Sequence, residues 1–292
     1  MYELIQAAGN SYYIDCPAKI GLVRTGEDEV CIIDSGSDKE AGRKVRQILD
    51  SHSWKLKSVF ITHSNADHIG GCSYLQKQSG CRIYAPGIEC GFTRHPVLEP
   101  AFLYGGFPSK DLRHKFLMAA ESEAMYLTDD VLENGMKAIP LPGHFFDMTG
   151  FRTADDVVYL ADCLSSRQTL EKYAVTFIYD VESYLSTLEM VSRMEARLFV
   201  PSHADACEDI STLARYNMDK VNEIAERICG FCREPKPCDE VIRCIFISYG
   251  LGINMQQYVL VGSTVRSYLS WLKDRGVLES VPEDGMILWK TL

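Results

Sequence analysis

The sequence predicts a layered α/β fold, because short apolar strands alternate with amphipathic helices and polar residues recur where strands end. The chain has 292 residues, which is enough to bury a large core in one big domain, or in one domain with a small appendage. Its 46% hydrophobic and 24% charged residues are typical of a soluble globular protein. No apolar run approaches the roughly 20 residues that span a bilayer.

Four short strands are expected before a tight turn at Asp34-Ser35-Gly36, and turn residues such as Gly9-Asn10 and Cys16-Pro17 separate them. The four strands are Ile5–Ala8, Ser11–Ile14, Ile20–Arg24 and Val30–Ile33. A helix should follow, because Asp38 is a suitable N-cap and apolar residues then recur at helical spacing. This order of strands and helix indicates an α/β layering rather than a helical bundle.

The next strand, Ser58–Ile61, ends in the densest group of polar donors in the chain. The group reads Thr62-His63-Ser64-Asn65-Ala66-Asp67-His68-Ile69-Gly70-Gly71. Two imidazoles and a carboxylate leave one strand end within six residues, and a strand end is a rigid place from which to aim ligands. A helix over Ile69–Gln78 is expected to pack on this strand, and Cys81–Ala85 is the next strand.

Residues 87–129 are irregular and aromatic, with a helix expected near Asp111–Met125. Two interpretations are open for this aromatic stretch. It is either an insertion packed on the core, or a lid that gives the site an apolar wall.

Three later strands also end in a polar residue. Met136–Leu141 leads to Pro142-Gly143-His144, and the strand Leu198–Val200 leads to Pro201-Ser202-His203. Thr149–Thr153 and Val157–Ala161 form a hairpin that ends at Asp162, and Tyr179–Arg193 is helical. The repetition of polar residues at strand ends indicates one common site.

The strand-end residues form a donor set that is suited to a catalytic metal ion. The set is His63, Asp67, His68, His144, Asp162 and His203, and it contains four of the seven histidines. Neutral imidazole with carboxylate suits zinc, and also iron or manganese. Asp34 is a candidate to orient one of the ligands. A metal ion there would bring the pKa of bound water towards neutrality for hydrolysis, with Asp67 and Asp162 as candidate catalytic residues that hold the water and pass on its proton. Cys163 is expected to pack in the core rather than act as a nucleophile.

These motifs resemble the metallo-β-lactamase fold superfamily, in order and in spacing, over about residues 1–230. The matching segments are Ile32-Ile33-Asp34-Ser35-Gly36, residues 62–71, Pro142-Gly143-His144 with Thr149-Gly150-Phe151, Leu160-Ala161-Asp162 and Pro201-Ser202-His203. The resemblance implies a four-layer αββα sandwich with a two-metal cleft along one edge of the paired sheets.

The resemblance also implies a role for each ligand. His63 and His144 would bind a first metal, whereas Asp67, His68 and His203 would bind a second, and Asp162 would bridge the two. Asn65 stands where the family usually has another histidine, and an amide oxygen is a poorer zinc ligand than imidazole.

Four outcomes of this departure are open. The second site is the only one that holds metal; the first site binds weakly, through Asn65 or water; a harder metal is preferred; or the site is catalytically incompetent. We favour a tight second site with a weak or substoichiometric first one.

The C-terminal part is expected to form a separate module, with domains at residues 1–232 and 233–292. Cys229, Cys232, Cys238 and Cys244 lie around this boundary, either as free thiols or as a structural metal site with irregular spacing. Helical spacing from Val241 to Tyr249 and over Thr264–Arg275, followed by the strands Val277–Ser280 and Met286–Trp289, resembles a winged-helix module. Its acidic and basic residues balance, which favours a packing or dimerising role over phosphate binding.

The sequence therefore predicts a metal-dependent hydrolase that uses metal-bound hydroxide on a small ester, thioester or lactone. One alternative is an RNA nuclease or phosphodiesterase that uses the C-terminal module, although the net charge of −10 argues against nucleic acid unless a local basic patch exists. Another alternative is a non-catalytic metal-binding protein with a site weakened by Asn65. A cytoplasmic location is expected, because the N-terminus lacks a signal-peptide pattern.

Overall fold

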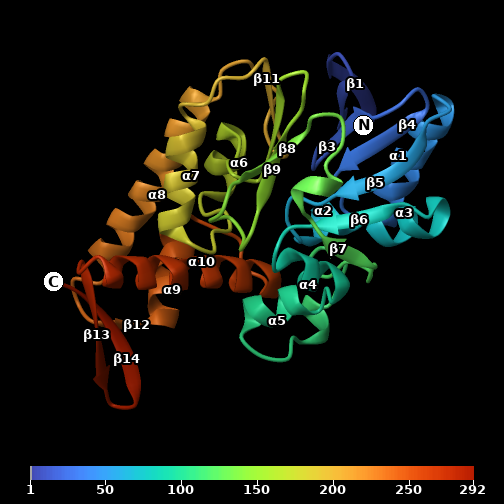
Figure 1. Cartoon of the computed structure of the whole chain (residues 1–292). Helices are drawn as coiled ribbons and strands as arrows, with labels where there is room; N and C mark the ends of the chain where they lie inside the picture. The colour runs from blue at the N-terminus through green and yellow to red at the C-terminus, as the bar shows by residue number, and fades with distance from the viewer. Residues whose placement is uncertain (1) are drawn as a thin grey trace.

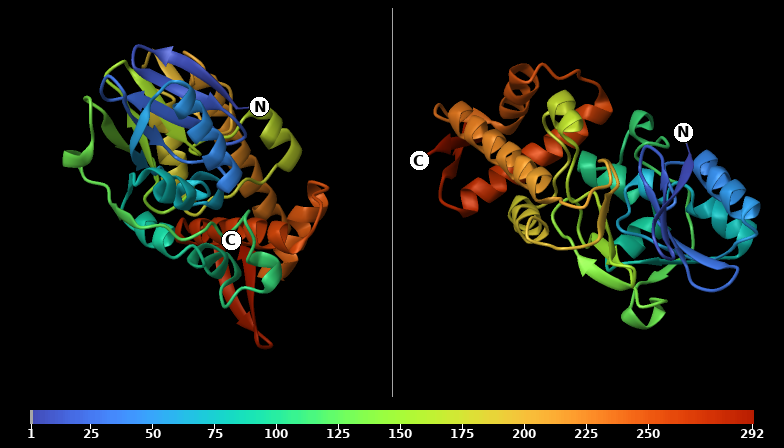
Figure 2. Two further views of the ribbon diagram at one scale, coloured as in Figure 1. Left: turned by 90° about the vertical axis from the view of Figure 1, so that its right-hand side faces the viewer. Right: turned by 90° about the horizontal axis from the view of Figure 1, so that it is seen from above.

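The computed structural model describes residues 2–292, and two β-sheets form its centre (Figures 1 and 2). The first sheet has the strand order β1-β2-β3-β4-β5-β6-β7, antiparallel from β1 to β4 and parallel from β4 to β7. Its strands are β1 Glu3–Ala8, β2 Ser11–Asp15, β3 Ile20–Arg24, β4 Glu29–Ile33, β5 Lys55–Phe60, β6 Arg82–Ala85 and β7 Ala124–Tyr126. The second sheet has the order β11-β10-β9-β8, made of β8 Lys137–Pro140, β9 Thr149–Arg152, β10 Val157–Ala161 and β11 Leu198–Pro201.

The two sheets pack face to face through apolar side chains that point inward from both. Cys31, Ile33 and Phe60 from the first sheet meet Phe151 and Val157 from the second. Alternate residues of the central strands point outward, where helices cover them, so strands such as β4 and β10 are buried on both faces. This arrangement confirms the αββα sandwich expected from the sequence.

The first sheet is covered by α1 Lys39–Ser51, α2 Ala66–Ile69 and α3 Cys72–Ser79. Asp38 caps α1 as expected, because its carboxylate accepts from the backbone of Glu40 and Ala41. The single helix predicted over Ile69–Gln78 is wrong at its start. The helix is interrupted at Gly70-Gly71, between α2 and α3. The backbone packs closely there, since a Cβ on Gly71 would lie 2.3 Å from the Ser35 carbonyl oxygen.

The helix predicted near Asp111–Met125 is also wrong. This segment holds only a 3₁₀ turn at Lys110–Leu112 before β7, and its charged and aromatic side chains offer no continuous apolar face. The helices of the aromatic stretch lie earlier, at α4 Glu89–Arg94 and α5 Leu98–Tyr104. A second 3₁₀ turn follows β7, at Asp129–Val131.

The second sheet is covered by α6 Arg167–Tyr173, α7 Val181–Val191 and α8 Ser211–Phe231, and then by the C-terminal elements. These are β12 Lys236–Pro237, α9 Cys238–Ser248, α10 Met255–Asp274, β13 Leu278–Glu283 and β14 Met286–Thr291. The predicted C-terminal hairpin is confirmed, and β12 joins it as a third strand. The last predicted helix is longer than expected, since Asn254 caps it.

The C-terminal elements share one apolar cluster with the second sheet, in which Leu188 of α7 and Leu269 of α10 belong together. The winged-helix likeness and the boundary after residue 232 stay predictions. Over residues 2–292, no helix is both long and apolar enough to cross a membrane.

Candidate metal centre

The predicted ligands lie together at one edge of the sandwich, just beyond the ends of strands from both sheets. His63, Asn65, Asp67 and His68 follow β5, whereas His144 follows β8. Asp162 follows β10 and His203 follows β11. Parallel pairing of β10 with β11 brings the last two side by side.

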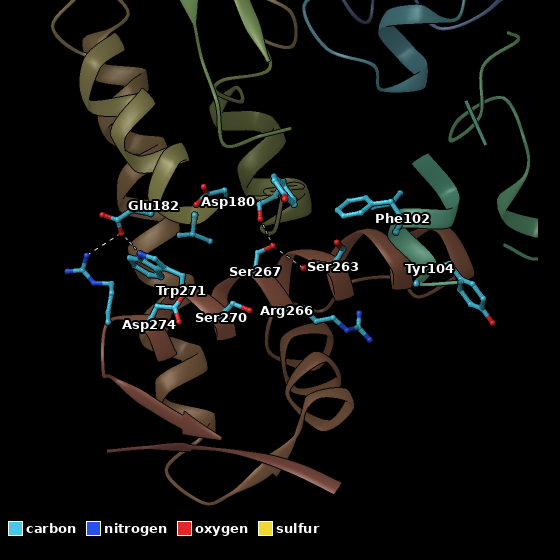
Figure 3. Close-up of a pocket in the computed structure, with 15 residues that line it drawn as sticks. Phe102, Tyr104, Asp180, Glu182, Ser263, Arg266, Ser267, Ser270, Trp271 and Asp274 are labelled. Atoms are coloured by element: carbon cyan, nitrogen blue, oxygen red, sulfur yellow. Dashed lines mark hydrogen bonds and ion pairs between the residues drawn. The ribbon is translucent and has the colours of Figure 1, made fainter. Parts of the chain in front are cut away.

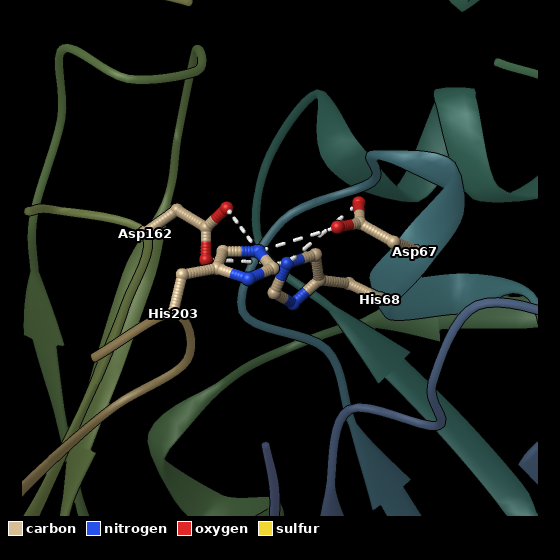
Figure 4. A group of neighbouring side chains, drawn as sticks. All are labelled: Asp67, His68, Asp162 and His203. Atoms are coloured by element: carbon tan, nitrogen blue, oxygen red, sulfur yellow. Dashed lines mark ion pairs between the residues drawn. The ribbon is translucent and has the colours of Figure 1, made fainter. Parts of the chain in front are cut away.

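One group of donors consists of Asp67, His68, Asp162 and His203 (Figure 4). His203 Nε2 lies 3.2 Å from an oxygen of Asp67 and 3.2 Å from Asp162 Oδ2. His68 Nε2 lies 3.2 Å from Asp162 Oδ1. We call these four residues the carboxylate-rich half of the centre.

A second group consists of His63, His144 and the same Asp162. Asp162 Oδ2 lies 3.9 Å from His63 Nε2 and 3.7 Å from His144 Nε2. The Asn65 amide oxygen lies beside this group, 3.1 Å from His144 Nε2. We call these residues, with Asn65, the amide half of the centre.

Hydrogen bonds fix all four imidazoles with Nε2 turned toward Asp162. The Nδ1 atoms of His144 and His203 lie 2.9 Å from the carbonyl oxygens of Phe177 and Pro17, which can only accept a hydrogen bond. Nδ1 therefore carries the hydrogen in both rings, and Nε2 is left to bind a ligand.

Asp34 fixes the other two rings from behind. It accepts from His68 Nδ1 at 2.8 Å and from the Thr62 hydroxyl at 2.7 Å, and that hydroxyl is 3.0 Å from His63 Nδ1. Asp34 is 2% exposed and has a φ of 64°, so it turns back under the site directly after β4. This is the orienting position that the sequence suggested for it.

The electrostatics of the centre are those of a site that attracts positive charge. Burial lowers the pKa of His68, but Asp162, Asp67 and Asp34 outweigh it and hold that pKa well above its usual value. In the same way, burial lowers the pKa of His203, whereas Asp162 and Asp67 raise it to a net value of about 10. Without a cation, the cluster therefore keeps protons on two of its imidazoles to offset its carboxylates.

The residues fit a divalent cation. His63 Nε2, His68 Nε2 and Asp162 Oδ1 are buried and have no hydrogen-bond partner among the described residues. Buried polar atoms without partners are costly, and here they converge on one space with donor types that suit zinc, iron or manganese.

Two further carboxyls, absent from the predicted set, reach the centre from the aromatic stretch. Glu89 of α4 is fully buried and accepts from the backbone N–H of Ser64 and of Asp147. Glu99 of α5 is 4% exposed and accepts from the Asn65 amide at 2.8 Å. A signal was present, since the stretch places acidic residues within short apolar segments, but their partners are distant in the sequence.

The predicted cysteine roles can be compared with the structure. Cys163 is buried, and burial with the nearby Asp162 raises the pKa of its thiol far above its usual value, so it is not activated as a nucleophile. The groups of described residues that are close enough to hold a metal contain no cysteine. Cys229, Cys232, Cys238 and Cys244 are therefore free thiols in this structure.

One cavity adjoins the centre, and a second lies beyond the aromatic rings behind it. One, of about 680 Å³, opens beside His203 and is lined by polar residues that include Lys19 and Arg167. The other, of about 840 Å³, lies between α5, α7 and α10 (Figure 3). Phe102 lines the second cavity and also packs on Phe145, which in turn contacts His63, so aromatic rings separate it from the amide half.

Comparisons with known proteins agree with this geometry. In the solved structures, the chain resembles a beta-lactamase domain protein from Burkholderia ambifaria, with a TM-score of 0.78, 18% identity and coverage of 99% of this chain and 94% of that one. It also resembles a metallo-beta-lactamase family protein from Thermus thermophilus, with a TM-score of 0.74, 15% identity and coverage of 97% and 99%. At these identities the likeness shows the fold.

Relatives in sequence match only segments. A hydroxyacylglutathione hydrolase of Bradyrhizobium sp. (strain BTAi1) is 28% identical over 131 residues, 44% of this chain and 41% of the relative. A ribonuclease J of Mycoplasma pneumoniae is 34% identical over 106 residues, 30% of this chain and 18% of the relative. The chain thus spans less than half of the length of these relatives.

The match to a family model is broader. The model of the metallo-beta-lactamase superfamily covers residues 13–203, a span that holds β3 to β11 and every predicted ligand. With the αββα sandwich and the strand-end donors already described, this match shows that the chain belongs to the metallo-β-lactamase superfamily.

Proposed function

We propose that this protein is a metal-dependent hydrolase of a small acyl substrate, and that a thioester is the best candidate within that class. The observation that carries the proposal is the pair of donor groups that share Asp162. The hydroxyacylglutathione hydrolases among the relatives support the choice of a thioester, although they match only part of the chain.

The side chains of the centre have distinct roles in such a reaction. A divalent cation held by the two donor groups supplies Lewis acidity that activates water and polarises the substrate carbonyl. Asp162 faces all four histidines and fixes the two groups relative to each other. Asp67 is the more exposed carboxylate, with 42% of its side chain accessible, so it can accept the proton of the attacking water and return it to a leaving group.

The polar cavity beside His203 is the best candidate for the substrate. Lys19 and Arg167 line it together with Asp205 and Asp209, so its charges balance and it suits a polar acyl group or thiol portion. The cavity volume of about 680 Å³ is in the range of small-molecule sites.

The RNA alternative has one relative in its favour, the ribonuclease J match. The charges of the C-terminal elements do not support it. Arg243, Arg266 and Lys290 are paired with Glu240, Asp239 and Glu279. Arg275 is paired with Glu182, and Lys273 donates to Ser280, so the described part of this module shows no cluster of free cations for a phosphate backbone. Salt-sensitive RNA binding that disappears on removal of residues 235–292 would support the alternative.

The test is a substrate panel run on metal-loaded protein whose metal content has been measured. Thioesters, lactones, esters, β-lactams and phosphodiesters are compared for the wild type and for His68→Ala. We expect thioester turnover in the wild type and its loss in the variant. Equal turnover in both would refute this centre as the active site, and absence of turnover with full metal content would favour the non-catalytic alternative.

A further inference from the structure

The side chain of Asn65 lies between the metal centre and a buried carboxyl. Its Oδ1 is 3.1 Å from His144 Nε2, and its Nδ2 donates to Glu99 Oε1 at 2.8 Å. Glu99 belongs to α5, in the aromatic stretch, and is 4% exposed. One planar amide therefore connects the amide half of the centre to α5.

The hydrogen-bond partners determine how this amide is turned. The Asn65 NH₂ group donates to Glu99 Oε1 and so leaves Asn65 Oδ1 toward His144. The Phe177 carbonyl also only accepts, so His144 carries its hydrogen on Nδ1 and presents a lone pair on Nε2. Two lone pairs thus face the same space at 3.1 Å, and a shared cation would relieve their repulsion.

We propose that Glu99 is a positioning residue for the metal centre, which holds Asn65 so that its amide oxygen serves as a ligand of the amide half. By accepting from the NH₂ group, the Glu99 carboxyl also polarises the amide and makes its oxygen a better donor to a metal ion. Carboxylates act on metal-binding histidines in the same way, through the ring nitrogen that does not bind the metal. Asn65 and Glu99 together then replace the imidazole expected at position 65.

This inference rests on the metal centre of the proposed function, but it concerns ion affinity rather than turnover. It gives the aromatic stretch a definite role, because α5 supplies a group that acts on the ion through Asn65. It also gives the amide half a weak ion site instead of an inactivated one. Because this site fills after the carboxylate-rich half, its ion is called the second ion, and that of the carboxylate-rich half the first ion.

The test is a metal titration of the full-length chain, with Zn²⁺ under chelator competition and with Co²⁺, whose visible absorption reports the ligands around the ion. The main variant is Glu99→Gln. A glutamine can donate to Asn65 Oδ1 and so allow the amide to turn over, which removes the oxygen from the ion. We expect the affinity for the second ion to fall about 10- to 100-fold, with a changed Co²⁺ spectrum, while the first ion binds as before.

Glu89→Gln is the matched control. It replaces an equally buried carboxyl of the same stretch, which bonds Ser64 and Asp147 rather than Asn65. Asn65→Ala completes a double-mutant cycle, and Glu99→Gln should have no further effect on second-ion affinity in that background.

Three results would overturn the inference. They are a second-ion affinity unchanged in Glu99→Gln, the same loss with and without Asn65, and a wild type that binds only one ion. Unaltered binding of the first ion shows that the Glu99→Gln variant is folded. If that variant does not fold, Asn65→Ala provides the test, and an unchanged second-ion affinity in Asn65→Ala overturns the inference by itself. Two ions without turnover would refute the proposed function and leave this inference intact.

Discussion

The two halves of the metal centre share Asp162 but differ in the charge of their other donors. The carboxylate-rich half adds Asp67, His68 and His203, whereas the amide half adds His63, His144 and a neutral amide. Both halves have two imidazoles, so the difference between them is one carboxylate against one amide. A cation is stabilised by ionised donors more than by neutral ones. The two halves should therefore differ in metal affinity, although both have two imidazoles and share Asp162.

The surroundings of the two halves differ as well. The carboxylate-rich half adjoins the polar cavity through His203, whereas the amide half is backed by aromatic rings and by the two buried carboxyls of α4 and α5. We infer that substrate approaches the carboxylate-rich half, and that the aromatic stretch positions the ligands of the amide half from the side away from the substrate.

The largest expected effect comes from removing one imidazole from each half in turn. His68→Ala should abolish tight metal binding and lower kcat/KM about 1,000-fold or more, because a lost metal removes several kcal/mol of transition-state stabilisation. His144→Ala should keep one tight ion per chain. Elemental analysis and kinetics on the two variants measure the difference. Equal metal loss in both would mean that the halves do not differ as proposed.

Glu89 should make the stability of the folded chain depend on pH. Burial raises the pKa of this carboxyl to about 7, against 4.5 for an ordinary glutamate, even though its bond from Ser64 lowers it. As the pH rises, Glu89 therefore loses its proton at a lower pH in the unfolded chain than in the folded one. The stability contributed by Glu89 is complete below about pH 4.5 and is lost as the pH rises through about 7, by roughly 3 kcal/mol.

Urea unfolding of the metal-free wild type and of Glu89→Gln, between pH 4.5 and pH 8, measures this dependence. Glu99 titrates in both proteins, so the difference between their two curves isolates Glu89. The wild type should lose stability relative to the variant as the pH rises. Parallel curves would contradict the assignment.

Much of this centre could be predicted from the sequence, because its ligands obey a local rule. His63, His144, Asp162 and His203 each follow a short apolar strand, and the ends of neighbouring strands meet at one edge of a sandwich. The strands of the first sheet follow from short apolar runs separated by turn residues, and the αββα layers are confirmed. Local pattern was sufficient wherever the fold itself brings the residues together.

The parts that the sequence did not predict depend on contacts between distant segments. Glu89 and Glu99 act on Ser64 and Asn65, and neither segment identifies its partner by spacing. The helix near Asp111–Met125 failed for a related reason. Its last two residues, Ala124 and Met125, pair with β6 instead, and the rest of the segment has no continuous apolar face.

Asp34→Asn should affect both halves, but not equally. Asp34 bonds His68 directly and reaches His63 only through Thr62. We expect metal affinity to fall about 10- to 100-fold in the carboxylate-rich half and less in the amide half, as measured by chelator competition. Asparagine tolerates the φ of 64° at this position, so the turn is kept. Asp38→Asn, which preserves the cap of α1, is the control and should bind both ions normally.

Asn65→His has the smallest expected effect and tests the comparison of the halves most directly. An imidazole at position 65 gives the amide half a third nitrogen donor, and its other ring nitrogen can donate to Glu99 as the amide does now. The amide half should then approach the carboxylate-rich half in affinity, so that measured metal rises towards about two ions per chain, with a gain in second-ion affinity of about tenfold. The reason is that imidazole is a better zinc ligand than an amide oxygen, while Asp162 and the loops around it stay in place.

Metal content of Asn65→His, measured after dialysis against a weak chelator, gives the result. If stoichiometry stays at the wild-type value while the variant remains folded, Asn65 is not the weak point of the centre, and the asymmetry must come from the carboxylate of Asp67 alone.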